Sequence, residues 1–125
     1  MIILDASALI AFVRKEVGKD KVEPYISKAS MSSVNFSEVI MRLQVCNIPM
    51  DVIRAIETDL LKAVIPFERE QAYLAASLRE QTKPLGLSFA DRACLALGKQ
   101  KNLPVLTADK AWAKLDIEIE IKLIR

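Results

Sequence analysis

Short apolar stretches of strand length alternate along this chain with longer stretches of helical periodicity. The first is Ile2–Leu4, and a helical pattern follows it almost at once. This alternation favours an α/β fold, a three-layer sandwich whose mainly parallel central sheet is flanked by helices. The 125 residues match the length of one domain. We therefore expect a single domain over residues 1–125, without repeats or linkers.

The positions of the expected elements follow from apolar periodicity and from breaking residues. Strands are predicted at 2–4, 29–34, 64–67, 103–106 and 116–124. Helices are predicted at 7–15 with Ser7 as the N-cap, and at 19–27, 35–47, 51–63, 68–81, 88–100 and 109–115. A loop is expected at 83–86. The last strand alternates strictly, which is typical of a half-exposed strand at a sheet edge.

Composition and charge exclude some classes of protein. The formal net charge is only +2, which is too small for a protein held to nucleic acid by total charge alone. No stretch approaches the roughly 20 apolar residues of a membrane span, and no basic segment precedes an apolar run at the start. We expect a soluble, cytoplasmic protein. Its hydrophobic share of 52% favours an apolar surface for a partner.

The side chains available for chemistry are restricted. The chain has no histidine, which removes the commonest general base and most zinc sites. Cys46 and Cys94 lie far apart without CxxC spacing, so we expect buried free thiols. Catalysis here would therefore depend on carboxylates, hydroxyls, lysine, arginine and a hard metal ion.

Four acidic residues fall where a parallel sheet would gather them. Asp5 ends the first strand, and Glu38 lies in the first turn of the helix after the second. Asp109 follows the strand at 103–106, and Asp91 lies in the first turn of the helix that begins at Ser88. In open parallel sheets, ligands bind beyond the carboxyl ends of the strands. The four acids are therefore candidates for one site.

Each acid also has a purely structural interpretation. Asn35-x-x-Glu38 and Ser88-x-x-Asp91 both resemble capping boxes, in which the acid accepts from the backbone N–H of the cap. Asp109 is a candidate N-cap of its own short helix. Asp5 ending a buried strand is the least ordinary of the four, although an Asx-turn would also place it there.

Taken together, the acids point to a metal ion. Four carboxylates in one cleft repel one another, and a hard divalent cation such as Mg²⁺ or Mn²⁺ relieves that repulsion. Ser7 and Thr107 are placed to orient the carboxylates. Such a site can hydrolyse phosphodiester bonds without histidine. The small residues 6–8 after Asp5 would leave room for a polynucleotide backbone.

The motifs that carry these acids resemble a known family. The segments DASAL at 5–9, NFSEV at 35–39, LSFADRACLALG at 87–98 and VLTADKAW at 105–112 are similar to those of PIN domains, in particular VapC-type ribonuclease toxins of toxin–antitoxin modules. The resemblance implies a PIN-like fold and a Mg²⁺- or Mn²⁺-dependent endoribonuclease. It matches the family's acidic quartet to the four acids one for one. It also implies a homodimer and a VapB-type antitoxin that covers the site.

One position departs from the resemblance, and several side chains keep two interpretations. Some members carry a further acid where this chain has Ala111, so one metal ion or two stays open. Lys83, Arg92 and Lys110 are candidates for RNA contacts, but solvated charge fits each of them, and Arg92 also suits a structural ion pair. Trp112 suits core packing or a dimer contact.

Other protein classes account for the pattern less well. A receiver domain would want adjacent acids at the end of the first strand, where Leu4 stands, and a haloacid-dehalogenase-type phosphatase would want a second acid at Ser7. Two alternatives stay open. One is a catalytically silent PIN fold that acts only as a binding module, and the other is a PIN nuclease with another nucleic-acid substrate.

Overall fold

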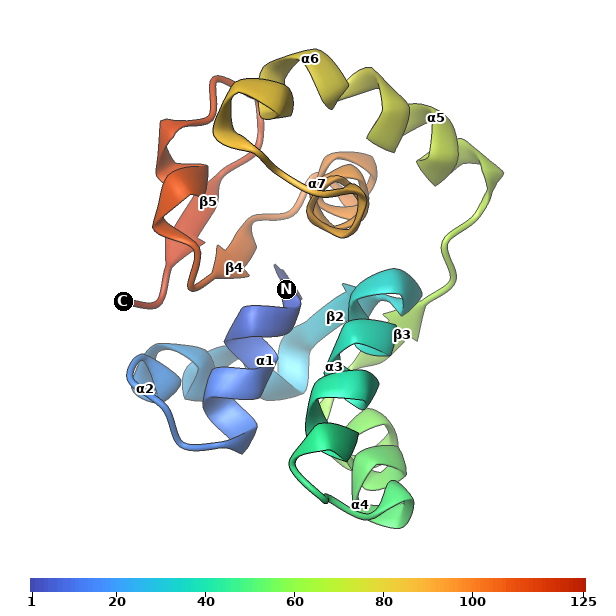
Figure 1. Ribbon diagram of the computed structural model, residues 1–125, viewed down its shortest axis with the longest axis vertical. Helices are drawn as coiled ribbons and strands as arrows, with labels where there is room; N and C mark the ends of the chain where they lie inside the picture. The colour runs from blue at the N-terminus through green and yellow to red at the C-terminus, as the bar shows by residue number, and fades with distance from the viewer.

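A computed structural model describes residues 1–125 and shows a five-stranded sheet between two layers of helices (Figure 1). The strands lie in the order β3-β2-β1-β4-β5, and every pair is parallel. Their bounds are β1 Ile2–Leu4, β2 Ala29–Ser32, β3 Ala63–Ile65, β4 Val105–Thr107 and β5 Ile121–Leu123. The predicted α/β sandwich is confirmed, and its sheet is parallel throughout.

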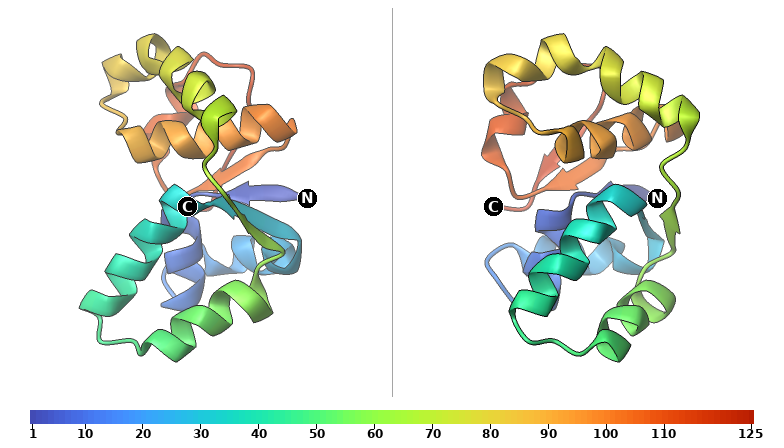
Figure 2. Two further views of the ribbon diagram at one scale, coloured as in Figure 1. Left: turned by 90° about the vertical axis from the view of Figure 1, so that its right-hand side faces the viewer. Right: turned by 45° about the vertical axis from the view of Figure 1, so that its right-hand side comes forward.

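The helices divide between the two faces of the sheet. In Figure 2, α5, α6 and α7 lie above the sheet, and α1 to α4 lie below it. The α-helices are α1 Ala6–Val13, α2 Lys19–Val22, α3 Ser33–Val45, α4 Met50–Ala55, α5 Arg69–Ser77, α6 Arg79–Thr82 and α7 Phe89–Lys101. Short 3₁₀ turns occupy Glu23–Lys28, Lys83–Leu85 and Lys110–Lys114, and one π-helical turn occupies Ile56–Leu60. None of these helices combines the length and apolar character needed to cross a membrane.

The central strand β1 contributes to both cores because successive strand residues face opposite sides of a sheet. Ile2 and Leu4 pack into the core between the sheet and helices α1 and α3, whereas Ile3 packs into the core between the sheet and α7. All three side chains are almost fully buried. Their burial on both faces explains why the first strand reads as an unbroken apolar run.

The strand order reverses at β1. The chain proceeds from β1 to β2 and β3 on one side, and then crosses to place β4 and β5 on the other. Such a reversal opens a crevice outside the carboxyl ends of the two strands where it occurs, here β1 and β4. Asp5 directly follows β1, and Asp109 lies two residues beyond β4. The topology therefore brings these two acids to one edge of the sheet.

Two predicted helix starts are wrong in ways that matter for the site. Asp5, and not Ser7, caps α1, because its carboxylate accepts from the backbone N–H of Ala6. The second strand ends at Ser32, whose hydroxyl caps α3, so that helix begins two residues before its predicted start. Asn35 therefore lies inside the helix, and its predicted capping box with Glu38 does not form.

The strand predicted at 116–124 pairs only over Ile121–Leu123. On β4 the residues that face β5 are Val105 and Thr107, and the next in that alternation, Leu103, donates its backbone N–H to the Gly98 carbonyl at 3.0 Å instead of to the segment before Ile121. Residues 117–120 nevertheless keep the alternation, with Ile117 and Ile119 packed against the core and both glutamates exposed. The position at the sheet edge is confirmed, but periodicity overstated the length of the strand.

Three further expectations concern single side chains. Trp112 is fully buried in the core under α7, so core packing is confirmed and a dimer contact through its ring is excluded. Cys94 is a buried free thiol, as predicted. Cys46 is also free but only half-buried, because it follows the last residue of α3 near the surface. The two sulfur atoms form no disulfide.

Candidate active site

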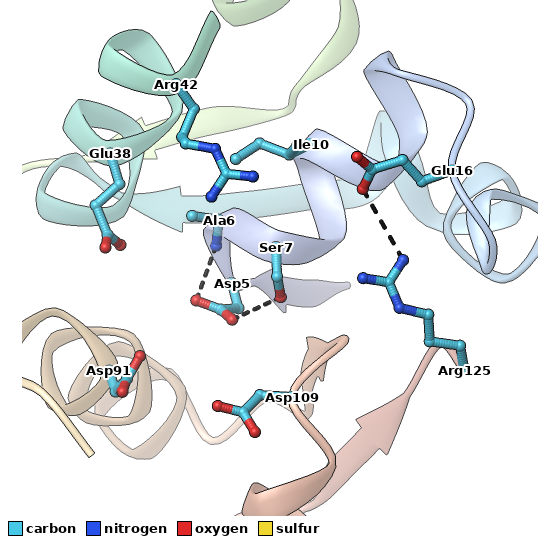
Figure 3. A pocket seen from close by; sticks show the side chains of 10 residues that line it. All are labelled: Asp5, Ala6, Ser7, Ile10, Glu16, Glu38, Arg42, Asp91, Asp109 and Arg125. Carbon is cyan, nitrogen blue, oxygen red and sulfur yellow. Dashed lines mark hydrogen bonds and ion pairs between the residues drawn. The ribbon is translucent and has the colours of Figure 1, made fainter. Parts of the chain in front are cut away.

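A pocket of about 310 Å³ opens at the carboxyl edge of the sheet. Its lining includes all four predicted acids, Asp5, Glu38, Asp91 and Asp109. They come from four different elements: the end of β1, helix α3, helix α7 and the turn after β4. Figure 3 shows their carboxylates pointing into the same space. The predicted gathering of the acids is therefore present in the structure.

Asp5 is the most buried of these acids, with 6% of its surface exposed. One of its oxygens, Oδ1, accepts from the backbone N–H of Ala6 at 2.8 Å. The other, Oδ2, accepts from the Ser7 hydroxyl at 2.8 Å and from the Thr107 hydroxyl at 2.9 Å. Ser7 and Thr107 thus hold the carboxylate from the chain segments after β1 and within β4, as the sequence predicted.

The two hydroxyls are themselves fixed by the backbone after β4. The N–H of Ala108 donates to Ser7 Oγ at 3.0 Å, and the N–H of Asp109 donates to Thr107 Oγ1 at 3.1 Å. Since each hydroxyl accepts from the backbone, its proton is free for Asp5. This network connects the ends of β1 and β4 and fixes the orientation of Asp5.

Burial works against ionisation of Asp5. Removal from water raises the pKa of Asp5 from 3.8 to about 6, and the negative charge of Asp91 acts in the same direction. The hydrogen bonds from Ser7, Thr107 and Ala6 oppose this rise without cancelling it. The fold therefore keeps a carboxylate where its charge is unfavourable, which is typical of functional sites.

Glu38 shows the same tendency more weakly. Partial burial raises its pKa and the charge of Asp91 adds to the rise, while a hydrogen bond from Asn35 and the nearby Arg42 lower it. The bond runs from Asn35 Nδ2 to Glu38 Oε1 over 3.2 Å. Asn35 is a member of the predicted motif, but its contact with Glu38 is within one helix and not a cap.

Asp91 and Asp109 combine the two roles that the sequence left open. Asp91 closes a capping box, because its Oδ2 accepts from the N–H of Ser88 at 2.9 Å and the Ser88 hydroxyl accepts in return. Asp109 caps the turn Lys110–Lys114 by accepting from the N–H of Ala111. Each uses one oxygen for its cap, and the other has no hydrogen-bond partner within the chain. Capping and pocket lining are therefore compatible.

The pocket also contains positive charge, from two arginines that were not predicted from the sequence. Arg42 and Arg125 line it, together with Glu16. Arg125 Nη1 donates to the Val17 carbonyl at 2.8 Å and lies 3.9 Å from Glu16 Oε1. Arg42 stands four residues after Glu38 on α3, and this spacing places both side chains on one helix face. The spacing could therefore have identified Arg42 as a pocket residue from the sequence. No local sequence pattern predicts Arg125 in the pocket, because its position depends on the register of β5 against β4.

The three predicted RNA-contacting cations do not line this pocket. Lys83 and Lys110 are exposed elsewhere on the surface. Arg92 is half-buried, and its Nη1 donates to the backbone carbonyl of Leu87 at 3.2 Å. Lys83 lies in the turn before α7, and Arg92 turns back on the start of that helix. Contact with RNA outside the pocket stays a prediction for them.

The donor set fits a hard divalent cation held loosely. All four candidate ligands offer carboxylate oxygens, which suit Mg²⁺ and Mn²⁺. The nearest thiol, Cys94, is fully buried, and burial together with the surrounding acids raises its pKa well above the usual range, so it stays protonated. As they lie in the structure, no three acidic, cysteine or histidine side chains are grouped closely enough to hold a metal ion between them. Mg²⁺ keeps several waters and needs only one or two carboxylates, so an open site of this kind suits it.

Comparison with known families agrees with this geometry. The family described as PIN domain matches residues 2–118. This range includes strands β1 to β4 and all four acids. The chain belongs to the PIN domain family. No curated protein sequence shows significant similarity to it.

Solved PIN structures share the fold over nearly their whole length. A toxin–antitoxin complex from Klebsiella pneumoniae matches with a TM-score of 0.81 and 18% identity, covering 100% of this chain and 98% of that one. A DNA-bound VapBC from Salmonella typhimurium matches at 0.74 and 15%, covering 99% and 98%. The Mycobacterium tuberculosis toxin VapC20, which cleaves the sarcin–ricin loop, matches at 0.74 and 15%, covering 96% and 99%. At these identities the similarity establishes the PIN fold.

Proposed function

We propose that this PIN domain is a metal-dependent endoribonuclease that acts as the toxin of a toxin–antitoxin pair. The observation that carries the proposal is the convergence of four carboxylates at the carboxyl edge of β1 and β4, with Asp5 buried and its pKa raised to about 6. PIN domains are generally nucleases that use divalent metal ions. A silent binding module would have no reason to keep this unfavourable charge.

Asp5, Glu38, Asp91 and Asp109 are the residues that would hold Mg²⁺ or Mn²⁺. When bound, the cation supplies the positive charge that lets the carboxylates ionise together and polarises a phosphodiester. Ser7 and Thr107 keep Asp5 in one rotamer through their hydrogen bonds. The unused oxygens of Asp91 and Asp109 remain available toward the pocket.

The other wall of the pocket suits a polynucleotide backbone. Arg42 is exposed, forms no direct ion pair, and points into the pocket in Figure 3. Ala6 adds a small side chain beside Asp5 and leaves the approach open. We assign Arg42 to a phosphate of the substrate, beside Glu38 on the same face of α3. Arg125 is partly neutralised by Glu16 and would contribute less.

The toxin role is supported by what the structural neighbours are. They include a toxin–antitoxin complex and a VapBC complex, and a related toxin cleaves the sarcin–ricin loop. We propose a VapB-type antitoxin and a homodimer as partners, and a cytoplasmic place of action where cellular RNA is available. Exposed apolar side chains on α3 and α4 offer area for such contacts: Met41, Val45, Met50 and Val52.

Cleavage of total cellular RNA by the purified protein tests this function. The arms are wild type with Mn²⁺, wild type with EDTA, and Asp5→Asn with Mn²⁺. We expect discrete fragments in the first arm alone. Cleavage in every arm would indicate a contaminating nuclease and remove the support for this site. Single-stranded DNA as a second substrate separates a ribonuclease from a nuclease of another specificity, and no cleavage of either would favour the silent binding module.

A further inference from the structure

Asn35 is a buried amide that contacts two sides of the acidic pocket. It lies in the first turn of α3 with none of its surface exposed. Its Nδ2 donates to Glu38 Oε1 at 3.2 Å and to the backbone carbonyl of Ala90 at 2.9 Å. Ala90 immediately precedes Asp91 in α7. One amino group therefore connects Glu38 on α3 with the backbone that carries Asp91 on α7.

The two contacts fix which way the amide points. Both partners are acceptors, so the amino group must face them and the carbonyl oxygen must face away. That oxygen is buried and has no hydrogen-bond partner. A buried polar atom without a partner destabilises a fold, so the amide is poorly explained as a device for stability alone.

A second buried amide, in the helix layer on the opposite face of the sheet, shows what is particular to Asn35. Gln71 on α5 is also buried, and its Oε1 also has no partner. Its Nε2 donates to the Pro66 carbonyl and to the Gln100 side chain, near the far end of α7. Both amides tie α7 to a neighbour, but only Asn35 contacts a residue of the acidic set. Both amides have an unpartnered oxygen, so Asn35 differs from Gln71 only in which groups its amino group contacts.

We infer that Asn35 is a positioning residue for the cation site: its amide holds the Glu38 carboxylate and the start of α7 together, so that Glu38 and Asp91 face the same ion. The inference rests on the proposed function and adds a residue to it. Asn35 does not touch the ion or the substrate. It acts through the two acids that it aligns, in the way that outer hydrogen bonds orient metal ligands.

The test compares Mn²⁺ binding by Asn35→Leu and by Gln71→Met, measured by calorimetry on the purified full chain. Each substitution replaces an amide with an apolar side chain of similar length and breaks two hydrogen bonds, one of them to α7. We expect Asn35→Leu to weaken Mn²⁺ binding by about 10- to 100-fold, as losses around metal ligands usually do. Gln71→Met should keep the wild-type Kd within about two-fold, although both variants lose stability to urea.

The outcomes separate positioning from general stability. A wild-type Kd in folded Asn35→Leu would overturn the inference, as would an equal weakening in Gln71→Met. Should Asn35→Leu fail to fold, Asn35→Ser takes its place, since its shorter side chain keeps a donor but cannot reach both acceptors; an unchanged Kd there would also overturn it. A wild-type protein that binds no Mn²⁺ would overturn the proposed cation site as well, whereas the other failures leave that site intact.

Discussion

The carboxyl edge of β1 and β4 and the contact between α5 and α7 both bury polar side chains, but with opposite consequences. Between α5 and α7, Gln71 is neutral and donates to Pro66 and Gln100. At the sheet edge, Asp5 is buried beside further carboxylates, and its pKa rises to about 6. Neutral contacts do not depend on pH, whereas the acidic edge opposes folding once it ionises. This difference supports the proposal that the acidic edge is the functional part of the molecule.

The largest effect should come from Asp5→Asn. We expect the variant to lose at least about 100-fold in the rate of RNA cleavage, because it removes the most enclosed of the four charges. Far-ultraviolet circular dichroism should match the wild type, since an amide can keep hydrogen bonds to Ser7, Thr107 and Ala6. The control substitution Gln71→Met, between α5 and α7, should keep the rate of RNA cleavage within about two-fold of the wild-type rate. A fully active Asp5→Asn would contradict the assignment of the site.

The next effect concerns the free energy of unfolding of the metal-free protein. The folded state binds the Asp5 proton more tightly than the unfolded state, with a pKa of about 6 against 3.8. The contribution of Asp5 to stability is therefore complete below about pH 3.8 and is lost as pH rises to about 6. A rise of this size corresponds to about 3 kcal/mol.

Urea denaturation in EDTA, at several pH values between about 4 and 7.5, measures this contribution. Asp5→Asn should be more stable than wild type above about pH 6, and its advantage should shrink toward about pH 4. Gln71→Met should be less stable than wild type by an amount that does not change with pH. An advantage of Asp5→Asn that is constant with pH, or absent, would show that the buried charge does not oppose folding.

A smaller effect is expected from the basic wall of the pocket. Arg42→Gln should raise the KM for RNA by about 3- to 10-fold and reduce its salt dependence, because one phosphate contact is lost. Mn²⁺ binding should be unchanged or slightly tighter, since a positive charge near the acids is removed. Arg79→Gln, at an exposed position on α6 far along the chain, is the matched control and should leave both quantities unchanged. Equal changes in the two variants would show that the effect comes from the loss of one positive charge anywhere on the protein, and not from Arg42 in the pocket.

The sequence was sufficient for the fold class and for the set of acids because both depend on local patterns. The apolar run at Ile2–Leu4 and the acids at strand and helix ends are visible without any tertiary information. Parallel pairing then brings Asp5 and Asp109 to one edge, which the alternation of elements already implied. The Ser88 and Asp91 capping box was equally local, and it formed as predicted.

The sequence was insufficient wherever the outcome depends on register or on contacts between distant segments. Asn35 looked like a helix cap, but Ser32 takes that place and leaves Asn35 buried against Ala90, 55 positions away. Arg125 enters the pocket because β5 pairs over three residues at one register. The pairing of that strand does not extend before Ile121 because the Leu103 N–H is bonded to the end of α7, which the alternation of residues 116–124 could not show.

The central claim is that four acids from four elements form one cation site. Calorimetric titration with Mn²⁺ near pH 7.5 tests it directly, on the wild type and on Asp5→Asn, Glu38→Gln, Asp91→Asn and Asp109→Asn. The account predicts saturable binding to the wild type, the greatest loss in Asp5→Asn, and weaker binding in each of the other variants. Wild-type affinity in Asp5→Asn, or no binding to the wild type at millimolar Mn²⁺, would contradict it.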